Sequence, residues 1–293
     1  MGGDSTACRA AAPRNVLITG ASRGLGRALA VAFWRRGDSL LLVARSGDAL
    51  REVIRGLPPP GNPQQRAHAV QADLAHAGAP AEVVAQAKGL WDRLDVLINN
   101  AAIAGPIGPA WQNDRAAWEQ TLRVNLLAPV ELCRGGAAWM IPQRAGSIIN
   151  LSGGGATSPR PNFSAYATAK AGLVRFSETL ARELAEFHIR VNAVAPGAMN
   201  TAMQRAVLDA GAARAGEKEY QLALEQGRDG GAPPERAAEL CLFLASPDAA
   251  GISGRLISAV WDDWPALGGR PELAASDIYT LRRIVPEDRG MQW

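Results

Sequence analysis

The chain has 293 residues, of which 47% are hydrophobic, enough for one large α/β domain with a full core or for two small domains. A net charge of +3 without any basic run argues against a nucleic-acid partner, and the absence of an apolar run near ~18 residues argues against a membrane span. The three cysteines form no Cys-x-x-Cys pair, so we expect no metal site and a reducing compartment, the cytoplasm.

Short apolar strands alternate with helical periods along most of the chain. Residues 1–13 are small and polar, and we expect a disordered lead-in there. Strands are predicted at 16–19, 40–44, 67–72, 96–99, 147–151, 190–194 and 255–260. Helices are predicted at 24–36, 47–56, 79–90, 114–141, 165–188 and 235–245, with a break at Pro129 as an option in the fourth. This order predicts one doubly wound α/β domain over 14–262, built on a seven-stranded parallel sheet with helices on both faces, and a tail over 263–293.

A glycine-rich turn, Thr19-Gly20-Ala21-Ser22-Arg23-Gly24-Leu25-Gly26, joins the first strand to the first helix. Gly20 permits the tight turn, Gly24 lets a pyrophosphate approach the backbone, and Gly26 lets helix and strand pack closely. The helix N-terminus then offers unpaired N–H groups to the phosphates. A strand before the turn and a helix after it favour a dinucleotide site over the alternative, a purely structural turn.

Tyr166 and Lys170 lie four residues apart in the helix predicted at 165–188, so they share a face. A free phenol has a pKa near ~10, too high for proton exchange at neutral pH. An ammonium about 4–5 Å away would lower that pKa by roughly 2–3 at an effective dielectric near 20. The pair therefore indicates acid/base chemistry, although such a spacing also arises by chance.

Together with Asn99-Asn100-Ala101-Ala102, Asn125, Pro196-Gly197 and Thr201, these motifs resemble the short-chain dehydrogenase/reductase family over about 14–260. The resemblance implies a Rossmann-type fold and NAD(P)-dependent interconversion of an alcohol and a carbonyl on a small molecule. It implies that Tyr166 is the acid/base, that Lys170 lowers its pKa and binds the ribose, and that Asn125 holds a relay water at a helix irregularity. It also implies a homodimer or homotetramer.

The same resemblance assigns cofactor contacts around the expected cleft. Asp73 and Leu74 are expected near the adenine, Asn99 on the adenosine side, and Pro196, Gly197 and Thr201 near the nicotinamide. The full set of expected cofactor residues is Gly20, Ser22, Arg23, Gly24, Leu25, Gly26, Arg45, Asp73, Leu74, Asn99, Ala101, Tyr166, Lys170, Pro196, Gly197 and Thr201.

The chain departs from the family at the serine that normally precedes the tyrosine by 13 residues, because Gly153 stands at that position. Three accounts are open. Ser152 takes the serine's role, or a backbone N–H of the glycine run donates to the reacting oxygen, or the site is slow or inactive. The loss of one such donor typically lowers the rate by about 10²- to 10³-fold.

The end of the second strand indicates which dinucleotide is preferred. An acid there accepts from both ribose hydroxyls in NAD-dependent enzymes, but here Val43 and Ala44 are followed by Arg45. A guanidinium suits a 2′-phosphate, and Arg23 in the glycine turn is a second partner for it. The sequence therefore predicts NADP(H) in preference to NAD(H).

Two further segments bear on the substrate. Residues 200–231 are mostly polar or small and correspond to the family's flap over the substrate, which favours a small polar substrate. The tail continues from Trp261 to Trp293, and its aromatic and acidic residues suit a polyol or sugar, or else an oligomer interface. We expect an alcohol dehydrogenase or ketone reductase. The alternatives are a non-catalytic dinucleotide sensor or scaffold, or another chemistry on the same fold.

Overall fold

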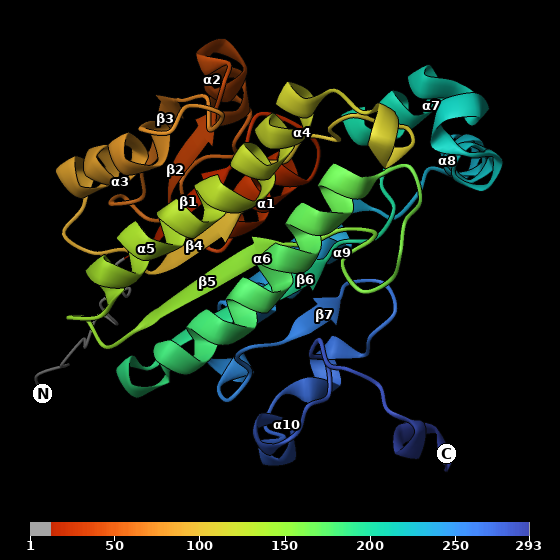
Figure 1. Cartoon of the computed structure of the whole chain (residues 1–293). Coiled ribbons are helices and arrows are strands. Elements are labelled where there is room, and N and C mark those ends of the chain that lie inside the picture. Colours follow the sequence, from red (N-terminus) through yellow and green to blue (C-terminus); the bar gives the residue numbers. More distant parts are fainter. Residues whose placement is uncertain (1–12, 293) are drawn as a thin grey trace, which may run out of the picture.

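The computed structural model of the protein describes residues 13–292 and contains one seven-stranded sheet with the order β3-β2-β1-β4-β5-β6-β7 (Figure 1). Every neighbouring pair of strands is parallel. The strands are β1 (Asn15–Thr19), β2 (Ser39–Ala44), β3 (Ala67–Gln71), β4 (Val96–Asn99), β5 (Gly146–Leu151), β6 (Ile189–Ala195) and β7 (Leu256–Ser258). The predicted fold is confirmed, and the lead-in expected at 1–13 lies, except for Pro13, outside the described residues.

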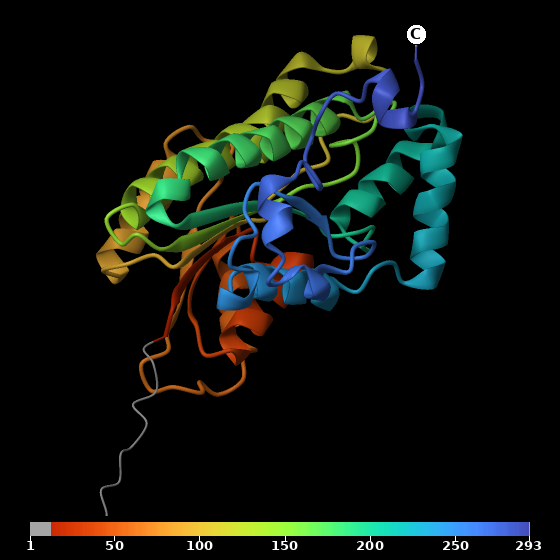
Figure 2. The same cartoon turned by 90° about the horizontal axis from the view of Figure 1, so that it is seen from below.

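Helices cover both faces of the sheet, as the view in Figure 2 shows from below. One apolar cluster joins the sheet to α1 (Gly24–Arg35), α2 (Gly47–Arg55) and α9 (Pro234–Leu244), and the other joins it to α3 (Ala79–Leu90), α5 (Ala128–Met140) and α6 (Ser164–Glu183). Neighbouring strand residues point to opposite faces, so Leu42 packs in the first cluster and Leu41 in the second. This is why all of β2 is apolar or small and buried.

The long helix predicted over 114–141 is divided by a π-helical turn. It consists of α4 (Arg115–Leu122), the π turn Arg123–Leu127, and α5. The irregularity therefore lies around Asn125, one turn before the break considered at Pro129. Pro129 has no N–H to donate to the Asn125 carbonyl, four residues earlier. In a π turn each N–H donates to the carbonyl five residues earlier, so the hydrogen-bond pattern around Asn125 is shifted by one residue.

The helix predicted over 165–188 is shorter than expected. α6 ends at Glu183 and is followed by a 3-10 turn, Ala185–Phe187. His188 then adopts a left-handed conformation with φ 56°, which turns the chain into β6.

Residues 200–231 form a helical hairpin, α7 (Ala202–Ala215) and α8 (Glu217–Asp229), that stands beyond the carboxyl ends of the strands (Figure 1). A single antiparallel bridge between Met199 and Gly231 joins the two legs of the hairpin at its base. The hairpin packs through Val207, Ala215 and Ala223 against Phe163 and Tyr166 at the start of α6.

The tail beyond residue 262 covers the β7 edge of the sheet and includes α10 (Pro271–Ala275). The Leu256 N–H donates to the Tyr279 carbonyl (2.8 Å), and the Arg255 guanidinium donates to the Ile278 carbonyl (2.8 Å). The Leu281 N–H donates to the Glu178 carboxylate of α6 (2.6 Å). The tail is thus tied to the domain by its backbone. None of the described helices is both long and apolar enough to cross a bilayer.

Candidate active site

A cavity of about 1440 Å³ opens at the carboxyl ends of the strands. Loops after all seven strands contribute to its wall, which is where parallel α/β sheets bind ligands. Of the residues predicted for the site, those that line this cavity are Gly20, Ser22, Arg23, Gly24, Leu25, Gly26, Arg45, Asp73, Leu74, Ala101, Ser152, Tyr166, Lys170, Pro196, Gly197 and Thr201. Asn99 and Asn125 are not part of the lining.

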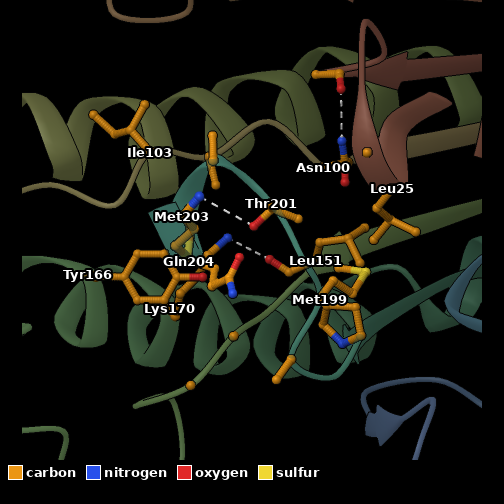
Figure 3. A pocket seen from close by; sticks show the side chains of 18 of the residues that line it. Leu25, Asn100, Ile103, Leu151, Tyr166, Lys170, Met199, Thr201, Met203 and Gln204 are labelled. Atoms are coloured by element: carbon orange, nitrogen blue, oxygen red, sulfur yellow. Dashed lines mark hydrogen bonds between the residues drawn. The ribbon is translucent and has the colours of Figure 1, made fainter. Parts of the chain in front are cut away.

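The glycine turn is held in shape at one end of the cavity by Asn100. Its side-chain amide donates to the carbonyls of Thr19 (2.9 Å) and Gly20 (3.2 Å). Gly20 has φ +65°, and a Cβ built on Gly26 would lie 2.1 Å from the Gly20 carbonyl oxygen. Side chains at these two positions would therefore force the turn open. Asn100, which the sequence analysis quoted without a role, is visible in Figure 3 beside this turn.

Asn99 is placed differently from its prediction. Its side chain is outside the cavity lining, and its amide donates to the Asn150 side-chain oxygen (2.8 Å) and to the Cys133 sulfur (3.3 Å). Asn99, expected on the adenosine side, therefore does not contribute to the wall of the cavity. It links β4 to β5 through Asn150 instead.

Tyr166 and Lys170 project from the same face of α6 into the cavity (Figure 3). The Lys170 ammonium lies 5.8 Å from the centroid of the Tyr166 ring and donates to the Leu151 carbonyl (2.6 Å). Both side chains are buried, with 5% and 2% of their surfaces exposed. The predicted pair is therefore assembled, and Lys170 is anchored to the end of β5.

The predicted lowering of the Tyr166 pKa by Lys170 does not occur in the free protein. Burial raises the pKa of Tyr166 to about 12, and the cation that opposes this rise is Arg160. Burial also lowers the pKa of Lys170 to about 8. Desolvation disfavours the charged form of either group, and the Lys170 ammonium is engaged with a carbonyl instead of the phenol.

Replacing Lys170 with methionine is expected to stabilise the free protein at pH 7. The lysine pKa falls from 10.5 to about 8 on folding. This fall destabilises the folded state by roughly 3 kcal/mol, at about 1.36 kcal/mol per pKa unit. The variant also loses the hydrogen bond to the Leu151 carbonyl, worth about 1 kcal/mol. We expect Lys170→Met to gain about 1–3 kcal/mol. Because the folded-state pKa is lowered, the penalty holds below pH 8 and fades as the pH rises toward 10.5.

Thermal unfolding of the cofactor-free variants at pH 7 and pH 10 measures this gain. Lys218→Met, at an exposed position of α8, is the matched control. A Lys170→Met protein that melts no higher than wild type at pH 7, or whose gain grows at pH 10, would contradict the prediction.

Asn125 lies in the π turn, fully buried behind the cavity wall. Its side-chain oxygen accepts from the Ile103 N–H (2.9 Å) and its amide donates to the Ile103 carbonyl (2.8 Å). Ile103 itself lines the cavity. Asn125 thus fixes the wall opposite α6 through a backbone segment that the sequence analysis did not single out.

Ser152 lines the cavity next to Tyr166, and its residue is 5% exposed. Its backbone N–H donates to the Val194 carbonyl (2.8 Å), while its hydroxyl has no hydrogen-bond partner among the described residues. A Cβ built on Gly153 would lie 2.2 Å from the Tyr166 phenol oxygen. The position of the family serine is therefore occupied by the phenol itself.

The side of the cavity formed by α7, α8 and the loop before α6 contains residues that no motif in the sequence indicated. Arg160, from the loop between β5 and α6, and Glu219, from α8, both line it and form an ion pair (2.7 Å). Gln204 of α7 also lines it and donates to the Ala223 carbonyl (2.8 Å). Arg160 could have been singled out from the sequence, because it is a charged residue between the glycine run and the helix that carries Tyr166. Glu219 could not be found, because only the folded hairpin brings it there.

Within residues 13–292, no group of three or more His, Cys, Asp and Glu side chains is placed to hold a metal ion.

Two other predicted residues, Asp73 and Thr201, make local hydrogen bonds in the cavity wall. Asp73 accepts the Ala75 N–H (3.0 Å), and Thr201 caps α7 by accepting the Met203 N–H (3.3 Å; Figure 3). The methyl group of Thr201 lies 3.9 Å from a Cβ built on Gly24, so the start of α7 faces the glycine turn.

Comparison with known proteins agrees with this geometry. Residues 14–211 match the family model for short chain dehydrogenases. The 3-oxoacyl-[acyl-carrier-protein] reductase FabG of Aquifex aeolicus is 32% identical over 241 residues, covering 82% of this chain and 93% of that protein. The structure of levodione reductase superposes with a TM-score of 0.76 at 26% identity, covering 90% of this chain and 99% of that one.

A metagenomic short-chain oxidoreductase in complex with NADP superposes with a TM-score of 0.65 at 29% identity, covering 80% of this chain and 91% of the other. The family model spans more than half of the chain, and its members act on CH–OH groups with NAD(P). The chain therefore belongs to the short-chain dehydrogenase/reductase family of NAD(P)-dependent oxidoreductases.

Proposed function

We propose that the protein is an NADP(H)-dependent oxidoreductase that interconverts a secondary alcohol and a ketone on a small polar substrate. One observation supports this most strongly. Tyr166 and Lys170 lie buried on one wall of a single cavity, and the glycine turn forms its other end. A proton donor and a nucleotide cradle in the same cavity suit hydride exchange coupled to proton transfer. The Tyr166→Phe variant described in the Discussion tests the proposal.

The residues of the cavity fit a dinucleotide. The helix that begins at Gly24 presents its N-terminal N–H groups to the pyrophosphate, and Ser22, Leu25 and Ala101 line the same end. Asp73 and Leu74 line the cavity too, and we propose that they contact the adenine. Pro196, Gly197 and Thr201 line the same cavity and would hold the nicotinamide amide. When bound, the cofactor supplies or accepts the hydride.

The chain's own residues then move the proton and hold the substrate oxygen. Tyr166 donates its phenol proton to a carbonyl oxygen, or takes the proton from an alcohol. Lys170 binds the ribose hydroxyls and, in the complex, is expected to lower the Tyr166 pKa. Ser152 donates a hydrogen bond to the reacting oxygen, because its buried hydroxyl has no partner of its own in the described structure. We propose that Asn125 positions a relay water, in addition to making its two hydrogen bonds with the Ile103 backbone.

Arg45 and Arg23 are proposed to bind a 2′-phosphate. Both line the cavity, both are exposed, and Arg45 directly follows the end of β2. We expect NADPH to bind at least about 10-fold tighter than NADH, since charge-assisted hydrogen bonds contribute about 1.5–3 kcal/mol. Replacing both arginines with alanine is expected to weaken NADPH about 10- to 100-fold and to leave NADH within about threefold.

Fluorescence titration of NADPH and NADH into wild type and the double variant measures this preference. Arg51→Ala, on the exposed side of α2, is the control because Arg51 pairs with Asp48 and is outside the cavity lining. Equal or tighter binding of NADH by wild type would refute the assignment.

The substrate is proposed to be polar, in the range of polyols and sugars. The hairpin wall of the cavity supplies the charged or amide side chains Gln204, Arg205, Glu219, Glu225, Gln226 and Asp229. Trp261 lines the cavity as well and is 86% exposed. The described tail residues beyond it pack on the β7 edge and α6 and are not among the lining residues, so an interface between subunits is the role we propose for them.

Assembly and location complete the proposal. We expect a homodimer or homotetramer, which size-exclusion chromatography with light scattering would measure. We propose cytoplasmic residence, because a chain with free thiols, such as the buried Cys133 and Cys241, fits a reducing compartment.

A further inference from the structure

The ion pair between Arg160 and Glu219 lies in the cavity wall, where the loop before α6 meets the α7–α8 hairpin. Arg160 Nε and Nη2 donate to the same Glu219 carboxylate oxygen, at 3.1 and 2.7 Å. The two side chains are 19% and 26% exposed, and both belong to the cavity wall. The pair therefore joins the loop before α6 to the helical hairpin at a place that a substrate must pass or touch.

The Arg160 guanidinium is held in a fixed place by its surroundings. Its central carbon lies 3.9 Å from the centroid of the Phe163 ring, and that ring is buried. A Cβ built on Gly154 would be in ordinary van der Waals contact with Arg160 Nη1, at 3.6 Å, so the guanidinium lies beside the glycine run. A planar cation stacked on an aromatic face and fixed by a carboxylate is preorganised for hydrogen bonding.

Arg160 also lies within one small molecule's length of the proposed proton donor. The Tyr166 phenol oxygen stands over Gly153, and Arg160 Nη1 stands over the next residue, Gly154. Consecutive Cα atoms are only ~3.8 Å apart. The electrostatic influence of Arg160 on Tyr166 agrees with this short separation. A substrate that reacts at Tyr166 can therefore reach Arg160 with another of its groups.

The pair's chemistry selects the kind of group that fits. Nη1 of Arg160 has no acceptor among the described residues, and the second Glu219 oxygen has no donor there. The pair is neutral as a whole and offers one donor and one acceptor, which a hydroxyl group matches because it both donates and accepts. An anion would face three carboxylates on this wall, those of Glu219, Glu225 and Asp229, against the single cation that α7 and α8 add there, Arg205. Displacing Glu219 would in addition leave a partly buried carboxylate unpaired.

We propose that Arg160 and Glu219 together recognise a second hydroxyl group of the substrate, so that the substrate is a neutral polyhydroxylated alcohol or ketone. The proposal rests on the proposed function, because it places the reacting carbon at Tyr166. Arg160 and Glu219 are specificity-determining residues in this scheme, and Tyr166 remains the proton donor.

The kinetic test compares two five-carbon alcohols, xylitol and pentan-2-ol, as the ratio of their kcat/KM values with NADP⁺. Any effect of Arg160 on the Tyr166 pKa cancels in this ratio. We expect wild type to prefer xylitol by at least about 10-fold, and Arg160→Met to lose about 10-fold or more of that preference. Glu219→Gln, which keeps an acceptor and a donor, should lose less. Arg115→Met/Glu119→Gln removes an exposed pair outside the cavity and should leave the ratio unchanged.

A binding test keeps the inference separate from turnover. Xylitol, erythritol and glycerol are titrated into the NADP⁺ complex of Tyr166→Phe, with and without Arg160→Met. Binding that weakens about 10-fold with Arg160→Met supports the inference even if wild type turns over none of the polyols, which would count against the proposed function alone. The inference is overturned if no polyol binds, or if the variant with Arg160→Met binds polyols as tightly as its parent. It is also overturned if the five-carbon acid xylonate binds more tightly than xylitol and Glu219→Gln tightens xylonate binding further.

Discussion

Tyr166→Phe is expected to lower kcat/KM by about 10²- to 10⁴-fold on any ketone or alcohol that the wild type turns over, because general acid–base catalysis contributes about that much. The substitution removes one oxygen from a buried side chain and leaves the ring in the apolar cluster with Phe163 and Val207. The fold and the cavity should therefore persist. Steady-state kinetics with NADPH and a panel of ketones measure the loss.

The control measurements separate chemistry from binding and folding. NADPH binding by Tyr166→Phe should stay within a few-fold of wild type, and the melting temperature should change little. Tyr279→Phe, in the tail, removes a phenol oxygen outside the cavity lining and should leave the kinetics unchanged. Full activity of Tyr166→Phe with intact NADPH binding would refute the role of Tyr166 as proton donor.

Ser152→Ala is expected to lower kcat by about 10²- to 10³-fold, the usual cost of removing one donor to a developing oxyanion. The wild-type hydroxyl has no partner in the described structure, so its removal should cost little stability. Ser147→Ala, at the other end of β5, is the matched control: Ser147 donates to the Leu244 carbonyl (3.2 Å) and should affect stability, not rate. An unchanged kcat for Ser152→Ala would favour a backbone N–H of the glycine run as the donor.

Placing the family serine at position 153 is not expected to rescue Ser152→Ala. The new Cβ would meet the phenol oxygen at 2.2 Å, so Tyr166 or the glycine run would have to move. We expect the double variant Ser152→Ala/Gly153→Ser to be no faster than Ser152→Ala alone. Recovery to within a few-fold of wild type would mean that the phenol shifts easily, and that Gly153 simply replaced a serine without consequence.

Local pattern was sufficient for the elements that carry the cofactor site. β1, the glycine turn and α1 follow one another within a few residues, and their contacts are largely set by chain neighbours. The four-residue spacing of Tyr166 and Lys170 on α6 was likewise readable, because helix periodicity alone puts both on one face. The central strands predicted the parallel sheet for the same reason, since an apolar run buried on both faces marks each of them separately, whereas the edge strand β3 is mostly exposed or half-buried.

Contacts between distant segments decided the rest. Asn99 and Asn100 are adjacent in sequence, yet β4 turns Asn99 toward Cys133 and leaves Asn100 to hold the glycine turn. The helix irregularity expected at Asn125 is confirmed, but its form as a π turn, and the bond from Asn125 to Ile103 22 residues away, were not predicted. The pairing of Arg160 with Glu219 required the α7–α8 hairpin to fold over the cavity.

The amino-acid sequence alone determined the fold and the family and supplied the proposed proton donor, because these depend on periodicity and on short motifs. Only the tertiary structure decided the electrostatic state of the site. Burial from several elements raises the pKa of Tyr166 to about 12 and lowers that of Lys170 to about 8, against the local attraction that the spacing predicted. Desolvation depends on everything packed around a group, and no pattern of neighbours along the chain contains that information.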